Sequence, residues 1–199
     1  MQENESVWLE RVQKGDVEAF AFLVEAYQRP VFNLCYRMLG DPHEAEDAAQ
    51  ETFFRAYRSI KRYDNSRPFP TWLLSIAAHY CIDQLRKRRV NTISIDEHDF
   101  LEIPDEQPGP ATAMWKSFEQ ERVRELLAEL HPTDRAAVVM YYWYDFSYEE
   151  IGKALSLTLS AVKSRLHRAR RSMADEWIKS QSQIVPKERE YHGEQSPAF

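Results

Sequence analysis

The chain has 199 residues, a mass of 23.5 kDa and a formal net charge of -6, and this length allows one domain or two small ones. No apolar run is long enough to cross a bilayer, and the first ten residues, MQENESVWLE, lack the basic and apolar regions of a signal peptide. We therefore expect a cytoplasmic protein without stable membrane insertion.

The charges of the chain are segregated into blocks. Residues 86–89 are four cations in a row, residues 163–171 hold five more, and residues 96–106 hold six acids without a Lys or Arg. Such blocks favour a protein that meets nucleic acid with some faces and a protein partner with others. Cys35 and Cys81 lie in apolar helical patterns without a CxxC pairing, so we expect buried free thiols, no metal site and no cofactor.

Strand signals are weak and helix caps recur, which predicts an all-α fold. A short helix over residues 8–14 should end at Gly15, and Asp16 should cap a longer helix that ends at Gly40. Within the longer helix we expect a break or kink at Pro30, because proline lacks the N–H and clashes with the preceding turn at a cost of about 3 kcal/mol.

The next helix has a strong start signal. Asp41, Pro42 and Glu44 supply an N-cap, a proline at the first helical position and a capping-box residue. The helix should bury Ala45, Ala48, Ala49, Thr52, Phe53, Ala56 and either Tyr57 or Ile60. Its polar side includes Asp47, Gln50, Glu51 and Arg55. Spacing alone leaves two interpretations of this side open, a solvated face and a docking surface for a basic partner.

A turn-rich loop, YDNSRPFP, covers residues 63–70 and leads into a helix that ends in the cations at 86–89. An exposed Phe69 and Trp72 beside Asn65 and Arg67 would suit unpaired nucleic acid, since aromatic rings stack on bases at about 1–3 kcal/mol each. In the alternative interpretation, Phe69 and Trp72 belong to the hydrophobic core.

Residues 91–112 are acidic, contain three prolines and show no sustained helical period. We expect this segment to be a flexible linker between an N-terminal unit, residues 1–90, and a C-terminal unit, residues 113–179. The polar residues 180–199 should form a disordered tail.

The C-terminal unit is predicted to be a bundle of four helices. The first ends at His131-Pro132, Thr133 or Asp134 caps the second, and the capping box of Ser147 and Glu150 starts the third. Ser160 is the N-cap candidate of the fourth.

The fourth helix is amphipathic and basic. It has an apolar stripe and no acidic residue from 160 to 173. A helix of this kind fits the major groove of DNA and gains affinity by releasing counterions from phosphates. A basic face that is only solvated is the alternative. The stripe consists of Val162, Leu166, Ala169 and Met173.

Three motifs in this order resemble bacterial sigma factors of the extracytoplasmic-function (ECF) subgroup of the sigma-70 family. They are GDPxEAEDAAQETFFRAY, YDNSRPFPTWLLSIAAHYCIDQLRKRR and LSAVKSRLHRARRSM. The resemblance covers residues 16–177 and implies a region 2 domain followed by a region 4 helix-turn-helix domain. It departs from the family pattern at Ser156, where a turn glycine is common, and at His79, where many relatives carry Asn.

The resemblance also implies partners for particular residues. Core RNA polymerase would be bound, at its β′ clamp helices, by Asp47, Gln50, Glu51 and Arg55. The promoter minus-10 element would be melted and bound by Tyr63, Asn65, Arg67, Phe69, Trp72, His79, Arg86, Lys87, Arg88 and Arg89. The minus-35 duplex would be bound by Ser160, Lys163, Ser164, Arg165, His167, Arg168 and Arg171. The polymerase β flap and an anti-sigma factor are further implied partners.

Two other function classes are weaker. A stand-alone helix-turn-helix regulator would explain residues 147–173 but leaves the loop at 63–70 and the acidic row at 44–51 without a role. An enzyme is disfavoured because the sequence has no phosphate-binding glycine loop, metal-ligand set or nucleophile and base at motif spacing.

Overall fold

The computed structural model describes residues 2–91 and 121–184. Every regular element in these two ranges is a helix, which confirms the predicted all-α class. The N-terminal bundle consists of α1 (Gln2–Gln13), α2 (Val17–Leu39), α3 (Pro42–Ser59), the short 3-10 helix η1 (Ile60–Arg62) and α4 (Phe69–Asn91). The second bundle consists of an α-helix whose described residues are 121–128, and of α6 (Pro132–Tyr144), α7 (Tyr148–Leu155) and α8 (Leu159–Ile184).

Two predicted segments fall largely outside these ranges. The acidic linker at 91–112 has only its first residue inside them. Of the predicted tail at 180–199, the structure describes the part up to Ile184, where α8 ends, so the helix continues beyond the predicted start of the tail. No helix in the two described ranges combines the length and the apolar character that crossing a membrane requires.

The caps that begin and end the first helices are local, and they form as predicted. The Asp16 carboxylate accepts from the Ala19 N–H at 3.1 Å, and that of Asp41 accepts from the Glu44 N–H at 2.8 Å. Gly40 ends α2 with a φ of 82°, in the left-handed region. The Glu44 side chain, by contrast, does not complete the expected capping box but forms an ion pair with Arg88 of α4.

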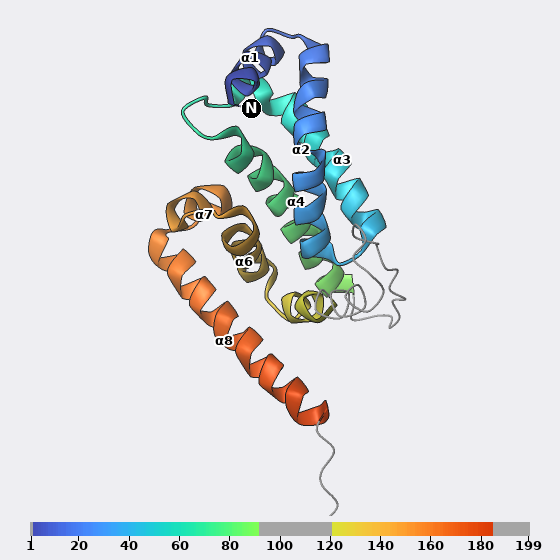
Figure 1. The fold of residues 1–199 in the computed structure, drawn as a ribbon, viewed down its shortest axis with the longest axis vertical. Coiled ribbons are helices and arrows are strands. Elements are labelled where there is room, and N and C mark those ends of the chain that lie inside the picture. Colours follow the sequence, from blue (N-terminus) through green and yellow to red (C-terminus); the bar gives the residue numbers. More distant parts are fainter. Residues whose placement is uncertain (1, 92–120, 185–199) are drawn as a thin grey trace, which may run out of the picture.

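Of the predicted break or kink at Pro30, the break is wrong, because α2 continues through the proline. The helix is the centre of the bundle and packs against α1, α3, α4 and α6 (Figure 1). Directly after the proline, Val31, Leu34 and Cys35 are fully buried. Burial of this apolar face stabilises the helix beyond the proline and offsets the local cost of the proline.

A stripe of small residues lets α3 lie close to α2. Ala45, Ala48, Thr52 and Ala56 are all fully buried, and the Thr52 hydroxyl donates to the Ala48 carbonyl at 2.7 Å within the helix. Ile60 is buried and Tyr57 is 40% exposed, which decides between the two predicted core residues. The polar side of α3 therefore faces solvent.

The second bundle rests on the first. The helix α6 packs on α2 and α4, and α7 packs on α4 (Figure 1). The cap of α6 is His131, whose Nδ1 accepts from the Thr133 N–H at 3.4 Å, so the predicted cap at Thr133 or Asp134 is wrong by two or three positions. The capping box of Ser147 and Glu150 forms as predicted at the start of α7.

Candidate nucleic-acid interfaces

The turn between α7 and α8 is tight. Ser156 ends α7 with a φ of 56°, in the left-handed region, as predicted for a residue in place of a turn glycine. A Cβ on Gly152 would lie 2.9 Å from the Leu157 carbonyl oxygen, so only glycine fits this close approach. The turn thereby fixes how α8 leaves α7.

The start of α8 differs from the sequence prediction. The Thr158 hydroxyl accepts from the Ala161 N–H at 3.2 Å, which makes Thr158 and not Ser160 the capping side chain. Ser160 is exposed in the first turn, and its hydroxyl lies 3.1 Å from that of Thr158.

The helix α8 has one buried and one exposed face. Val162, Leu166 and Ala169 are at most 1% exposed and pack on the bundle, as the apolar stripe predicted. Five of the predicted minus-35 residues besides Ser160 are exposed, and they form a basic surface on the opposite face. They are Lys163, Ser164, His167, Arg168 and Arg171.

The Arg165 side chain is not part of this basic surface. Its Nη1 donates to Asp134 Oδ1 of α6 at 2.6 Å, and the side chain is 27% exposed. Arg168 reaches the same carboxylate at 3.6 Å but is 58% exposed. Arg165 is therefore held between α8 and α6, whereas Arg168 stays available at the surface.

Arg170, which was not among the predicted site residues, is also held within the bundle. Its Nε donates to the Tyr142 hydroxyl at 2.9 Å, and its guanidinium lies 5.3 Å from the centroid of the Tyr141 ring. The hydrogen bonds to Tyr148 and Tyr142 raise the pKa of Arg170.

The loop before α4 is built by its own side chains. Asp64 accepts from the Ser66 N–H at 2.9 Å and from the Ser66 hydroxyl at 2.8 Å, and these bonds lower the pKa of Asp64. Gln13 of α1 donates to the Tyr63 carbonyl at 3.2 Å and to Asn65 Oδ1 at 3.3 Å. No local signal in the sequence pointed to Gln13, because this contact joins residues far apart in the chain.

Aromatic side chains form a cluster next to this loop. The Phe69 ring lies 5.4 Å from that of Tyr27, 5.6 Å from that of Tyr63 and 5.7 Å from that of Trp72, measured between centroids. Phe69 is 1% exposed, so the predicted exposure of Phe69 is wrong and the alternative core interpretation holds for it. Tyr63 is 7% exposed, its hydroxyl donates to the Arg67 carbonyl, and burial raises its pKa to about 12.

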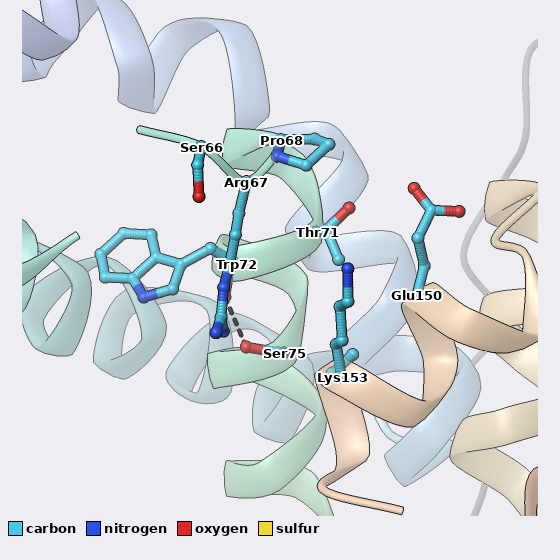
Figure 2. Close-up of a pocket in the computed structure, with 9 residues that line it drawn as sticks. Ser66, Arg67, Pro68, Thr71, Trp72, Ser75, Glu150 and Lys153 are labelled. Carbon is cyan, nitrogen blue, oxygen red and sulfur yellow. Dashed lines mark hydrogen bonds between the residues drawn. The ribbon is translucent and has the colours of Figure 1, made fainter. Parts of the chain in front are cut away.

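The other side chains of this candidate surface remain accessible. Asn65, Arg67 and His79 are exposed and Trp72 is half-buried. Arg67 and Trp72 line a pocket with Thr71, and the far side of the pocket is formed by Glu150, Lys153 and Ala154 of α7 (Figure 2).

The four cations at the end of α4 differ in environment. Arg86, Lys87 and Arg89 are exposed. Arg88 is half-buried, pairs with Glu44 and donates to the Leu39 carbonyl at 3.4 Å, and burial lowers its pKa. Arg88 therefore ties α4 to the junction between α2 and α3.

The polar side of α3 is the candidate polymerase surface. Asp47 and Gln50 are exposed, and Glu51 accepts from Arg55 Nε at 2.7 Å. The Arg55 guanidinium lies 4.9 Å from the Tyr80 ring centroid. Phe54, 55% exposed, lies one turn beyond Gln50 and adds an apolar group that the sequence prediction missed.

The sequence matches two protein-family profiles, "Sigma-70 region 2" over residues 23–90 and "Sigma-70, region 4" over residues 120–173. It is 35% identical over 172 residues to the ECF RNA polymerase sigma factor SigW of Bacillus subtilis, covering 83% of this chain and 92% of that protein. It is 36% identical over 164 residues to the ECF RNA polymerase sigma factor SigE of Mycolicibacterium smegmatis, covering 82% of this chain and 63% of that protein.

Two solved structures share the fold. CnrH, solved with the cytosolic domain of CnrY, aligns with a TM-score of 0.64 at 23% identity over 88% of this chain and 98% of CnrH. The sigma factor RpoE of Bartonella quintana, solved with the anti-sigma factor NepR, aligns with a TM-score of 0.63 at 20% identity over 82% of this chain and 98% of RpoE. Together with the two family profiles and the identity to SigW, the arrangement of a region 2 bundle and a region 4 helix-turn-helix shows that the chain belongs to the ECF sigma factors of the sigma-70 family.

Proposed function

We propose that three surfaces of this protein divide promoter recognition between them. The polar side of α3 docks on core RNA polymerase, the loop at 64–67 with Trp72 binds the unpaired minus-10 strand, and the exposed face of α8 reads the minus-35 duplex. The observation that carries the proposal is the division of α8, which buries its apolar stripe while Lys163, His167 and Arg168 face solvent. Cations on one exposed helix suit the phosphates and base edges of a major groove.

The two DNA-binding surfaces work together when both are attached to polymerase. Each bundle alone presents a small surface, so each DNA contact by itself is weak. Once one contact forms, the tether raises the effective concentration of the other surface at its own DNA element. The protein itself carries no enzymatic activity in this scheme, and it acts in the cytoplasm, where chromosome and polymerase are.

An anti-sigma factor is the expected regulator. The two similar structures were solved with the cytosolic domain of CnrY and with the anti-sigma factor NepR, which supports a partner of this class for the present chain. Such a partner would compete with polymerase or DNA for the surfaces described above.

Reconstituted transcription tests the function. Core RNA polymerase of Bacillus subtilis, with and without the purified full chain, is supplied with sheared chromosomal DNA of the source bacterium. We expect discrete transcript 5′ ends that appear only when the protein is present. If polymerase gains no new start sites while the protein alone footprints duplex DNA tightly, the protein is a stand-alone regulator.

A charge reversal tests the docking surface. Glu51→Lys should weaken binding to core polymerase by about 10-fold or more. The new Lys would face the basic partner surface that the acidic side of α3 is proposed to bind, and like charges at an interface repel. Glu25→Lys makes the same change at an exposed position of α2 and should leave binding unchanged. If both variants bind core polymerase equally well, α3 is not part of the polymerase interface.

A further inference from the structure

A side chain of α1 ties the loop before α4 to the rest of the first bundle. The amide nitrogen of Gln13 donates to the Ile60 carbonyl at 3.3 Å, to the Tyr63 carbonyl at 3.2 Å and to Asn65 Oδ1 at 3.3 Å. The first two acceptors are backbone groups at the start and just after the end of η1, and the third is an exposed side chain. Gln13 therefore joins η1 to the loop at 64–67.

The packing of α1 holds Gln13 in position. Val12, the residue before it, is 2% exposed, and Leu9 one turn earlier is 6% exposed. The Trp8 ring stacks on the Phe22 ring of α2 with 5.5 Å between the centroids. A hydrogen-bond donor on a packed helix is placed more precisely than one on a loop. The loop is thus held from outside by a rigid element.

The acceptors fix which way round both side-chain amides lie. A backbone carbonyl can only accept, so Gln13 must turn its NH₂ group, and not its oxygen, toward Ile60 and Tyr63. That NH₂ group also faces Asn65, so the Asn65 amide must turn its Oδ1 inward to accept from it. The NH₂ group of Asn65 is left on the outer side of an exposed residue.

This orientation decides which base edges Asn65 can recognise. An Asn side chain that is free to turn recognises adenine through both ends of its amide, donating from the NH₂ group and accepting at the oxygen. Here the oxygen is turned inward and already accepts from Gln13, so the outward group of Asn65 only donates. Two adjacent acceptors, such as N3 and O2 of cytosine, fit such a donor better than the mixed edge of adenine.

We propose that Gln13 is a positioning residue for the minus-10 surface. It makes Asn65 a hydrogen-bond donor toward the unpaired strand and thereby favours cytosine over adenine at the base beside Asn65. Gln13 itself does not touch DNA in this scheme. Without Gln13 the Asn65 amide turns over freely, and the preference between the two bases falls. This inference rests on the proposed role of the loop at 64–67.

The orientation of the amides is tested by NMR on the free, isotope-labelled full chain. Exchange of side-chain NH₂ protons with water is compared for Gln13, Asn65 and Gln28, which is exposed on α2. We expect exchange at Gln13 to be slower than at Gln28 by about 2-fold or more, and exchange at Asn65 to be as fast as at Gln28. Protection of Asn65 without protection of Gln13 would mean that the amides lie the other way round, and would overturn the proposal.

The base preference is tested with core RNA polymerase of Bacillus subtilis and the full chain. The template is one of the promoters found by reconstituted transcription, with its minus-10 region randomised, and the bases that support transcription are sequenced. Asn65→Ala identifies the position that Asn65 reads, since the preference is lost there. At this position the wild type should prefer cytosine to adenine, and Gln13→Met should lower that preference by about 2- to 10-fold.

Two further variants separate positioning from a merely structural role. Gln13→Lys offers only donors and should retain the cytosine preference. Asn65→Asp still accepts from Gln13 but has no outward donor, so it should lose the preference. Gln28→Met makes the control change at an exposed position and should alter neither the preference nor the urea midpoint. A merely structural role of Gln13 would lower the urea midpoint and the transcript yield of Gln13→Met without altering the ratio of cytosine to adenine.

Three results in transcription would overturn the proposal. They are an unchanged ratio of cytosine to adenine in Gln13→Met, loss of the preference in Gln13→Lys, and the absence of any position that responds to Asn65→Ala. Failure of the proposed function would look different, because the wild type would then produce no start sites at all. The exchange rates of Gln13 and Asn65 would still report the orientation of the two amides.

Discussion

The Asp134 carboxylate of α6 accepts a hydrogen bond from Arg165 of α8 at 2.6 Å. Only 11% of the Asp134 side chain is exposed, so water screens this ion pair weakly. The pair joins the helix that carries the DNA-reading side chains to the helix that supports it. Arg165 therefore joins α8 to α6 in this structure, and its predicted contact with DNA stays a prediction.

Arg165→Ala should destabilise the C-terminal bundle by about 1–3 kcal/mol, because it leaves a largely buried carboxylate without its main partner. DNA affinity should fall with stability, and a double-mutant cycle with Asp134→Asn should show coupling in urea unfolding. An Arg165→Ala variant of unchanged stability that binds DNA poorly would instead place Arg165 on the DNA.

Arg168 and Arg171 should be separable by salt dependence. Loss of one phosphate contact lowers the slope of log K against log salt by about 0.9, so Arg171→Ala should reduce the slope by about one. Arg168→Ala should weaken discrimination between the minus-35 sequence and scrambled duplex by about 1–3 kcal/mol. Arg170→Ala is the control, because Tyr142 already holds Arg170. An equal loss of affinity for the minus-35 duplex and for the scrambled duplex would mean that Arg168 contacts phosphate and not bases.

Ser156→Gly should stabilise the protein by about 1 kcal/mol, since a non-glycine residue at a φ of 56° is strained. Ser160→Gly tests the opposite case, because glycine within the first turn of α8 should cost about 0.5–1 kcal/mol. Urea unfolding midpoints of the two variants should move in opposite directions. A shift of both in the same direction would contradict strain at Ser156.

Gly152→Ala should destabilise the helix-turn-helix by about 1–3 kcal/mol, because the new Cβ would press on the Leu157 carbonyl. The control Gly15→Ala meets no neighbour within 4 Å and should cost only the strain of its positive φ. In Gly152→Ala, the thermal unfolding midpoint and the affinity for duplex DNA should both fall. Unchanged duplex binding would show that α8 tolerates a wider turn.

Stability should fall with acid through His131. Desolvation of the ring, and the cations Arg89, Arg165 and Arg86, lower the pKa of His131 although the residue as a whole is exposed, while Asp134 opposes them. The folded state therefore binds the proton less well than the unfolded state. The contribution of His131 is complete above a pH of about 6.5 and is lost as the pH falls below that value. His131→Asn keeps a capping side chain, and its urea midpoint should drop less between about pH 7.5 and about pH 5.5. An equal drop in the urea midpoint of the wild type and of His131→Asn would mean that His131 does not cause the loss of stability in acid.

The sequence predicted what depends on neighbouring residues. The caps at Asp16, Asp41 and Ser147 formed because each bond spans only three residues. The apolar stripe of α8 and the family motifs likewise located the two bundles. Pro30 and Phe69 were misjudged because packing by distant helices decided the outcome.

The candidate site was predictable in composition but not in arrangement. Exposure of Lys163, His167 and Arg168 followed from helical periodicity. The capture of Arg165 by Asp134, 31 positions away, depends on how α6 and α8 cross. The anchoring of the loop by Gln13 is also a contact between distant segments.

The alanine stripe of α3 has a consequence for the proposed docking on polymerase. Alanine has no rotamers to freeze, so the layer beneath Asp47 and Gln50 already occupies its final conformation before any partner arrives. A preorganised backbone loses little entropy on association. The affinity of α3 for polymerase should therefore depend on its solvent-facing side chains alone. The backbone of α3 should already be rigid in the free protein.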